Sequence, residues 1–153
     1  MKLKIILLSI LDIILITLLI LCLFNLKAYA SPVTTVTNEQ FDDIILLAKV
    51  INGEAGAEWC SDEMRYGVGS VVANRVASDE FPDTYEEVIY QEGQYGCLHT
   101  SYFKQFPPEH CIAIAADIII EGNKYPPDVV YQSNEPLGSR TYRHIQNMYF
   151  GYI

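Results

Sequence analysis

Residues 37–58, TNEQFDDIILLAKVINGEAGAE, decide the fold that we expect for this chain. Thr37 and Gln40 have the spacing of a capping box, in which two side chains bind free backbone N–H groups at a helix start. Apolar residues then recur with the period of a helix as far as Ala55, and a glycine, which is a common helix stop, follows them. The stretch therefore predicts an amphipathic helix over residues 38–55.

Two further helices are expected directly downstream. Ser61 or Asp62 can cap a helix that continues to about Ala77 and carries four valines with helical spacing. Thr84 opens a second capping box, TYEE, before a short helix that ends near Tyr90. Together with the first helix, these elements predict a helical core.

The second half of the chain changes in character. Residues 91–106 are rich in glycine and aromatic residues and have no sustained period, which favours a loop with some extended pairing. Two prolines begin an apolar helical run over residues 107–122, which ends in glycine. Residues 129–132 and 148–152 are short β-like runs around a turn-rich middle. We therefore expect an α+β fold, mainly α, with a small C-terminal β element.

The N-terminus has the features of an export segment. Lys2 and Lys4 precede an apolar run over residues 5–24, and Ala28 and Ala30 have the spacing of a signal-peptidase site. We predict a cleaved signal peptide; the alternative is a retained anchor, with membrane association through the apolar run. Both place the remainder of the chain outside the cytoplasm. The expected division is residues 1–30 as signal peptide or anchor, residues 31–36 as linker and residues 37–153 as the functional domain.

The charge of the chain is divided unevenly. Of the net charge of −9, residues 1–30 carry +2 and residues 31–153 carry −11. A surface of that sign repels phosphate backbones, so nucleic acid is not an expected partner. Uncharged polymers such as glycans are compatible with it.

The cysteines beyond the export segment are Cys60, Cys97 and Cys111. An odd number allows at most one disulfide, and an exported location favours one. The spacing leaves the pairing open, with Cys60 bonded to either of the other two. The paired spacing of a zinc site is missing, so we expect neither a metal nor another cofactor.

Glu54 is the side chain that suggests a chemistry. It follows Ile51 by three positions and Leu47 by seven, so it continues the apolar side of the first helix. A carboxyl group at the edge of a core is partly desolvated, which favours its protonated form, and a neutral carboxylic acid can protonate a glycosidic oxygen. Gly53 and Gly56 remove bulk around it and are expected to leave room for a ring-shaped substrate. The alternative is a helix-end glutamate that only faces solvent.

Four segments of the chain, taken in order, resemble the cell-wall hydrolase family of spore-cortex-lytic enzymes (SleB-like). The segments are LAKVINGEAGAE, YGVGSVVANRV, FPDTYEEVIYQEGQY and the terminal VVYQ with YFG. The resemblance implies a secreted peptidoglycan glycosidase with a lysozyme-like fold. It also implies cleavage of the β-1,4 bond between MurNAc and GlcNAc in peptidoglycan glycan strands, as lytic transglycosylases perform it.

The resemblance carries two acidic positions over to this chain. Glu54 matches the catalytic glutamate of the family, and Glu58 matches a second glutamate that is a possible second carboxylate. A lytic transglycosylase needs one carboxyl group, whereas a hydrolytic muramidase needs two. The family often has Arg-Gly where this chain has Gly56 and Ala57, and a non-catalytic peptidoglycan-binding module is therefore the alternative function.

Further residues are candidates for binding the sugar. Ser70 lies among small residues of the second helix and is a candidate hydrogen-bonding partner of Glu54 or of a sugar; the alternative is a close helix contact. The other candidates have aromatic or amide side chains in loop or strand-edge segments: Gln94, Tyr95, Tyr131 and Gln132. Asn74 and Arg75 match the Asn-Arg pair of the family, and we expect them to tie the helix end to the next loop.

Overall fold

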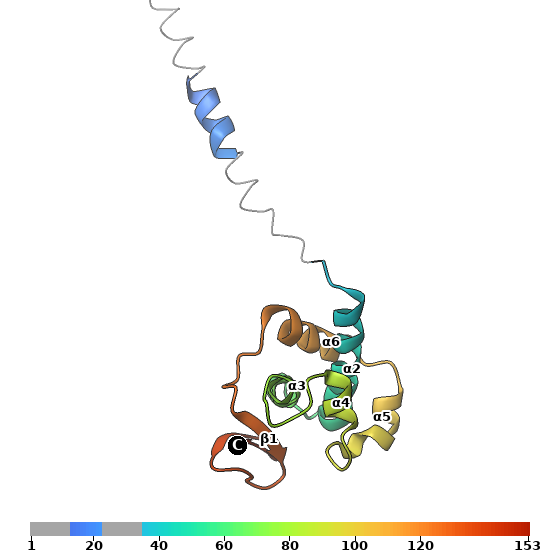
Figure 1. The fold of residues 1–153 in the computed structure, drawn as a ribbon. Helices are drawn as coiled ribbons and strands as arrows, with labels where there is room; N and C mark the ends of the chain where they lie inside the picture. Colours follow the sequence, from blue (N-terminus) through green and yellow to red (C-terminus); the bar gives the residue numbers. More distant parts are fainter. Residues whose placement is uncertain (1–12, 23–34) are drawn as a thin grey trace, which may run out of the picture. The chain divides into compact units, whose positions relative to one another are not determined.

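The computed structural model describes residues 13–22 and 35–153 of the chain (Figure 1). It divides into two units, Met1–Thr35 and Val36–Ile153, which are treated separately. Residues 13–22 are helical, and their apolar side chains are exposed. The expected peptidase site at Ala28 and Ala30 lies outside the described residues. Within the two described ranges, no helix is both long and apolar enough to cross a membrane.

The first helix of the second unit has the expected bounds. Helix α2 spans Asn38–Ala55, and both hydrogen bonds of its capping box are formed. The Gln40 backbone N–H donates to Thr37 Oγ1 at 3.1 Å, and the Thr37 N–H donates to Gln40 Oε1 at 3.1 Å. The apolar face of α2 is buried, including Leu47 and Ile51. The capping box and the periodicity therefore gave the correct helix.

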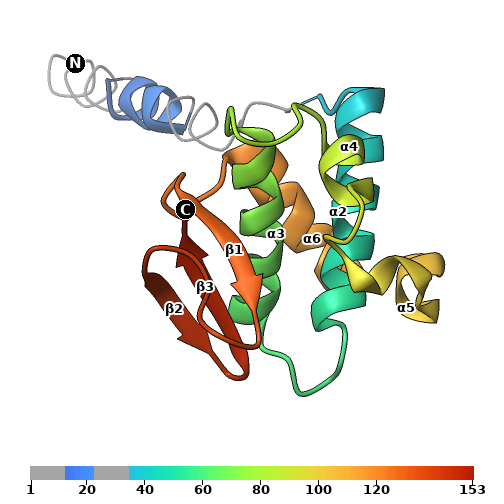
Figure 2. The same ribbon diagram turned by 60° about the horizontal axis from the view of Figure 1, so that its bottom comes forward.

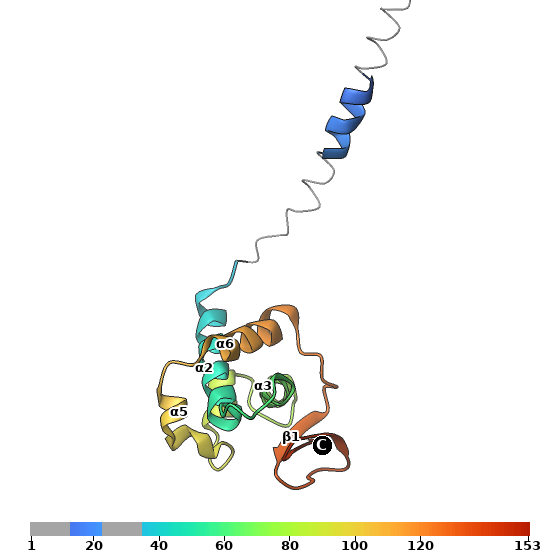
Figure 3. The same ribbon diagram turned by 180° about the vertical axis from the view of Figure 1, so that it is seen from behind.

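Helix α3, Asp62–Val76, begins at the Ser61 cap and forms the centre of the unit. Its glycines allow close packing on two sides. A Cβ on Gly69 would lie 2.6 Å from Ile118 and 3.0 Å from Ile51, and one on Gly67 would lie 2.5 Å from the Phe150 ring. Side chains from other elements thus fill the space beside the glycines of α3. Helices pack on one side of α3 and the sheet packs on another (Figures 2 and 3).

The segment after α4 differs from its prediction. Helix α4, Tyr85–Tyr90, ends as expected, but the next residues form the 3₁₀ turn η1, Gly96–His99, and the short helix α5, Ser101–Lys104. The expected extended pairing is wrong because local capping and burial favour a helical turn. The Thr100 hydroxyl accepts from the Phe103 N–H at 3.3 Å, and the Phe103 side chain is buried.

The last helical run continues to the predicted glycine. Helix α6, Glu109–Ala116, passes directly into a π-helical turn η2, Asp117–Glu121. Gly122 then has a φ of 93°, which favours glycine and ends the helix. The π-helical turn itself has no signature in the sequence pattern.

The C-terminal residues form an antiparallel three-stranded sheet (Figure 2). The strands are β1, Val129–Ser133; β2, Thr141–Ile145; and β3, Met148–Tyr152, in the order β1-β3-β2. Two strands were predicted, and β2 was missed. Its residues follow a turn-rich stretch and are mostly exposed, so it lacks the apolar alternation of a half-buried strand. The fold class, α+β and mainly α, is as expected.

Candidate active site

A cleft of about 620 Å³ lies between the end of α2, the loop at residues 93–96 and strand β1. Glu54, in the last turn of α2, is half-buried and lines this cleft. The residues that line it are Glu54, Arg75, Phe81, Gly93, Gln94, Tyr95, Gly96, Tyr131, Gln132, Ser133, Asn134, Leu137 and Met148. Glu54 is the only carboxylate among them. The cleft therefore offers one acidic group surrounded by aromatic rings and amides.

The guanidinium group of Arg75 joins two walls of the cleft. Its Nε donates to the Val130 carbonyl at 2.8 Å, while its Nη1 donates to Gln94 Oε1 at 2.9 Å and to the Tyr95 hydroxyl at 3.3 Å. The same group lies over the rings of Phe81 and Tyr95, at 5.1 and 5.5 Å from their centroids. Because Arg75 is buried, these contacts fix strand β1 and the 93–96 loop relative to α3.

Asn74, the neighbour of Arg75, fastens the same strand to α3. Its Nδ2 donates to the Pro126 carbonyl at 2.7 Å and to the Val129 carbonyl at 2.9 Å. Its Oδ1 accepts from Asn123 Nδ2 at 2.6 Å. The Asn-Arg pair therefore has a structural role, but it ties α3 to the segment entering β1 rather than only to the next loop.

Two neutral groups lie beside Glu54. Burial raises the pKa of the Cys97 thiol, and the charge of Glu54 and a hydrogen bond to its carboxyl group raise it further. Burial also raises the pKa of Tyr95 to about 12, although Arg75 acts in the opposite direction. Both groups are therefore protonated at neutral pH, so the buried surroundings of Glu54 contain neutral groups here and not charges.

The glycines next to Glu54 do not leave room for a substrate, so that expectation is wrong. A Cβ on Gly53 would lie 2.7 Å from Cys97 Cβ and 2.8 Å from Cys97 Sγ. A Cβ on Gly56 would lie 2.5 Å from Asn52 Oδ1. The space beside both glycines is occupied by the protein itself, and the open space in front of Glu54 comes from the 93–96 loop and β1.

The structure brings most of the candidate residues together. Gln94, Tyr95, Tyr131 and Gln132 all line the cleft with Glu54. The Gln132 Oε1 atom is buried and has no hydrogen-bond partner within the described part of the chain. A buried amide oxygen without a partner is costly unless a ligand supplies a donor. Gln132 therefore brings an amide oxygen without a protein donor to the cleft.

Two candidates lie elsewhere. Ser70 is fully buried in α3, does not line the cleft, and its hydroxyl has no hydrogen-bond partner in the described residues. Glu58 is exposed in the turn after α2 and does not line the cleft. Sequence reasoning missed Ser133 and Asn134, which follow Gln132 at the end of β1 and line the cleft. The signal that could have identified them is that they directly follow the predicted residues Tyr131 and Gln132 in the sequence.

The disulfide expected between two of the three cysteines beyond residue 30 is not formed. Cys60, Cys97 and Cys111 are all free and buried. The Cys97 side chain packs against Gly53 and Glu54 instead. Burial raises the pKa of Cys111 to about 11 and also raises the pKa of Cys60, so all three groups are thiols at neutral pH.

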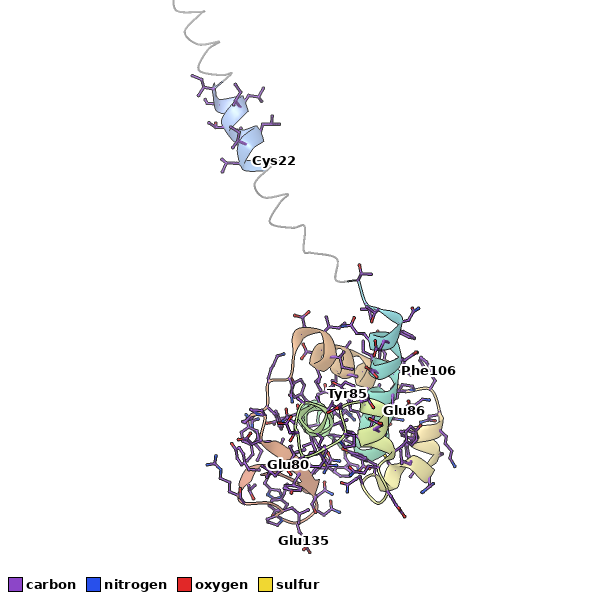
Figure 4. The ribbon with its side chains drawn as sticks, in the orientation of Figure 1. Cys22, Glu80, Tyr85, Glu86, Phe106 and Glu135 are labelled. Carbon is purple, nitrogen blue, oxygen red and sulfur yellow. The ribbon has the colours of Figure 1, made fainter. Side chains whose placement is uncertain are left out.

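Figure 4 shows that the side chains are densely packed around α3, while Glu135, in the segment after β1, projects away from the unit. Glu135 follows the cleft residue Asn134 directly but does not line the cleft. Glu135 is therefore not a second carboxylate of the cleft, although it is close to the cleft in sequence.

A family model described as cell wall hydrolase matches residues 61–150. The match includes α3, the 93–96 loop and most of the sheet; Glu54 precedes it. Among solved structures, the catalytic domain of the Bacillus cereus SleB protein has a similar fold, with a TM-score of 0.61 and 21% sequence identity. That similarity covers 79% of this chain and 98% of the other. No curated protein matches the sequence.

Proposed function

Since the chain belongs to the cell wall hydrolase family, we propose that it degrades peptidoglycan as a lytic transglycosylase. The bond cleaved is the β-1,4 bond between MurNAc and GlcNAc, and Glu54 is the general acid and base. The observation that carries the proposal is that Glu54 is the only carboxylate lining a cleft otherwise formed by aromatic, amide and apolar groups and one arginine.

The reaction needs one carboxyl group that is used twice. Protonated Glu54 first donates its proton to the glycosidic oxygen, and the bond between that oxygen and C1 of MurNAc breaks. The resulting carboxylate then takes the proton of the MurNAc 6-hydroxyl, whose oxygen forms the new bond to C1. The products are a chain end with a GlcNAc hydroxyl and a 1,6-anhydro-MurNAc end, and Glu54 is again protonated.

A hydrolytic mechanism is less well supported by this cleft. A retaining glycosidase places two carboxyl groups about 5–5.5 Å apart, and an inverting one places them about 6.5–9.5 Å apart. Glu58, the expected second carboxylate, is exposed and does not line the cleft. With no second carboxylate among the described residues that line the cleft, an internal hydroxyl of the substrate is the better nucleophile.

The other lining residues suit the recognition of a glycan strand. Tyr131 offers a ring on which a sugar can pack, and Gln132 offers a free amide oxygen. Gln94 is held by Arg75 through its Oε1, so its NH₂ group is left to donate to the substrate. Arg75 is thus a positioning residue in this proposal, and it acts through Gln94 and Tyr95.

The place of action follows from the family and from the N-terminal segment. Cell wall hydrolases act on the wall, which lies outside the cytoplasm. The basic and apolar start of the chain supports export by a signal peptide or anchor over residues 1–30. We propose a secreted or wall-associated enzyme, with membrane association where the segment is retained.

The experiment compares matched glutamine variants of the full-length protein on purified peptidoglycan. Glu54→Gln keeps the shape of the side chain but removes its proton, so the release of soluble fragments should fall by about 100-fold or more. Glu58→Gln is the control and should retain most of the activity because Glu58 is outside the cleft. Undiminished release by Glu54→Gln would overturn the assignment, and binding without release by the wild type would favour a non-catalytic wall-binding module.

A further inference from the structure

A second cleft adjoins the first on the other side of the 93–96 loop. It has a volume of about 370 Å³ and is lined by Tyr90, Gln91, Glu92, Leu98 and His99 together with the loop. Gly93, Tyr95 and Gly96 line both clefts. The two cavities therefore meet at the 93–96 loop, which connects α4 to η1.

Two of the three residues that line both clefts are glycines, on either side of Gln94 and Tyr95. Gly93 and Gly96 have no side chains, and a Cβ built on either would have no atom within 4 Å. Both glycines therefore face open space. Tyr95, the third shared residue, is buried and its hydroxyl accepts a hydrogen bond from Arg75. A polymer in the first cleft can therefore continue past Gly93 and Gly96 into the second.

Tyr90 is the aromatic ring at the far end of this path. The residue is 54% exposed, and its ring makes a T-shaped contact with the ring of Phe103, with centroids 6.3 Å apart and an interplanar angle of 87°. The contact positions the ring, and its exposure leaves aromatic surface for packing against the apolar face of a sugar. Gln91 and His99, both exposed, add hydrogen-bonding groups at the same cleft.

We propose that a glycan strand bound at Glu54 crosses Gly93 and Gly96 and occupies the second cleft, where a sugar ring stacks on Tyr90. The proposal rests on the proposed function, because it takes the ligand of the first cleft to be a polysaccharide. A polymer must leave a cleft of this size at its ends, and the glycine crossing is an exit without steric obstruction. The second cleft thereby makes the protein selective for long strands over short saccharides.

The experiment measures the binding of peptide-free glycan strands to the full-length protein with the Glu54→Gln substitution, which prevents turnover. Long strands and a single disaccharide are compared by fluorescence titration. Tyr90→Ala should weaken the binding of long strands by about 10-fold and change disaccharide binding by less than about 2-fold, because truncating an aromatic anchor costs roughly 1.4 kcal/mol. Tyr90→Phe should restore long-strand binding, since the ring is retained.

The matched control is Tyr102→Ala, which removes a comparably exposed tyrosine that lines neither cleft. It should leave the binding of both ligands unchanged. Equal effects of Tyr90→Ala on long and short ligands, or no effect on either, would overturn the proposal while leaving the function at Glu54 intact. If the wild type did not cleave peptidoglycan but Tyr90→Ala still weakened the binding of long strands selectively, the proposed reaction would be wrong and the second binding cleft would stand.

Discussion

The buried thiol of Cys97 interacts with the carboxyl group of Glu54, which raises the pKa of the thiol. The two residues come from η1 and the end of α2, and they meet because Gly53 lets the cysteine pack directly against the helix. Glu54 thus has a buried, neutral group on one side and lines the cleft on the other.

The Glu54→Gln variant should make Cys97 more reactive. The negative charge of Glu54 raises the pKa of Cys97, so its removal should lower that pKa. Burial should still keep the pKa above the ordinary value of a cysteine. The rate of alkylation at Cys97 as a function of pH, followed by peptide mass mapping, measures this change. An unchanged pH profile for Cys97 would mean that the two side chains do not interact as described.

Gly53→Ala should lower both stability and activity. Its new Cβ would lie 2.7 Å from Cys97 Cβ, so the η1 backbone or α2 must move, at a cost of about 1–3 kcal/mol in the free energy of unfolding. Urea denaturation measures the loss. Gly96→Ala is the matched control for stability, because its Cβ meets no atom within 4 Å, and it should change the free energy of unfolding by less than about 0.5 kcal/mol. Equal stabilities of the two variants would contradict the packing of Cys97 on α2.

Arg75→Met should destabilise the protein by about 2–4 kcal/mol, because it leaves the buried Val130 carbonyl without its donor and releases Gln94. Arg75→Lys should recover little, since an ammonium group cannot serve both walls of the cleft at once. Thermal unfolding provides the measurement. Arg140→Met, at an exposed arginine that stacks on Tyr152 at 4.1 Å, is the control and should cost less than about 1 kcal/mol. A comparable loss at both positions would argue against a bridging role for Arg75.

Stability should fall between about pH 10 and pH 12. Burial raises the pKa values of Tyr85, Tyr95 and Tyr125 from 10 in the unfolded chain to about 12 in the folded protein. The folded state therefore holds these protons more tightly, and the stabilisation is present below pH 10 and lost as pH rises through the folded values. Denaturant titrations at several alkaline pH values measure the slope, and Tyr95→Phe should reduce it. A slope that Tyr95→Phe leaves unchanged would show that Tyr95 titrates as in the unfolded chain.

The sequence predicted those elements whose signals are local. The capping boxes at Thr37 and Thr84 and the cap at Ser61 determined where α2, α4 and α3 begin, because each cap needs only residues three positions apart. Strand β2 escaped prediction because its side chains are mostly exposed and it is held by pairing with β3, which is not local. The helical turns η1 and α5 escaped it because they depend on burial of Cys97 and Phe103.

The candidate site shows the same division. Glu54 was singled out by its position on the apolar side of α2 and by the family resemblance, and the amide and tyrosine candidates by their positions near loops and strand edges. The role of Cys97 was missed because cysteines in an exported chain suggest a disulfide, whereas its partner here is a carboxyl group 43 positions earlier. Contacts between distant segments of this kind leave no periodic signal.

The most direct test of the account is the chemistry of the products formed in water enriched in a heavy oxygen isotope. With Glu54 as the sole acid and base, wild-type digests should contain 1,6-anhydro-MurNAc ends that carry none of the heavy isotope, and Glu54→Gln should form almost none of them. Reducing MurNAc ends that carry the heavy isotope would show that water is the nucleophile and would contradict the central claim.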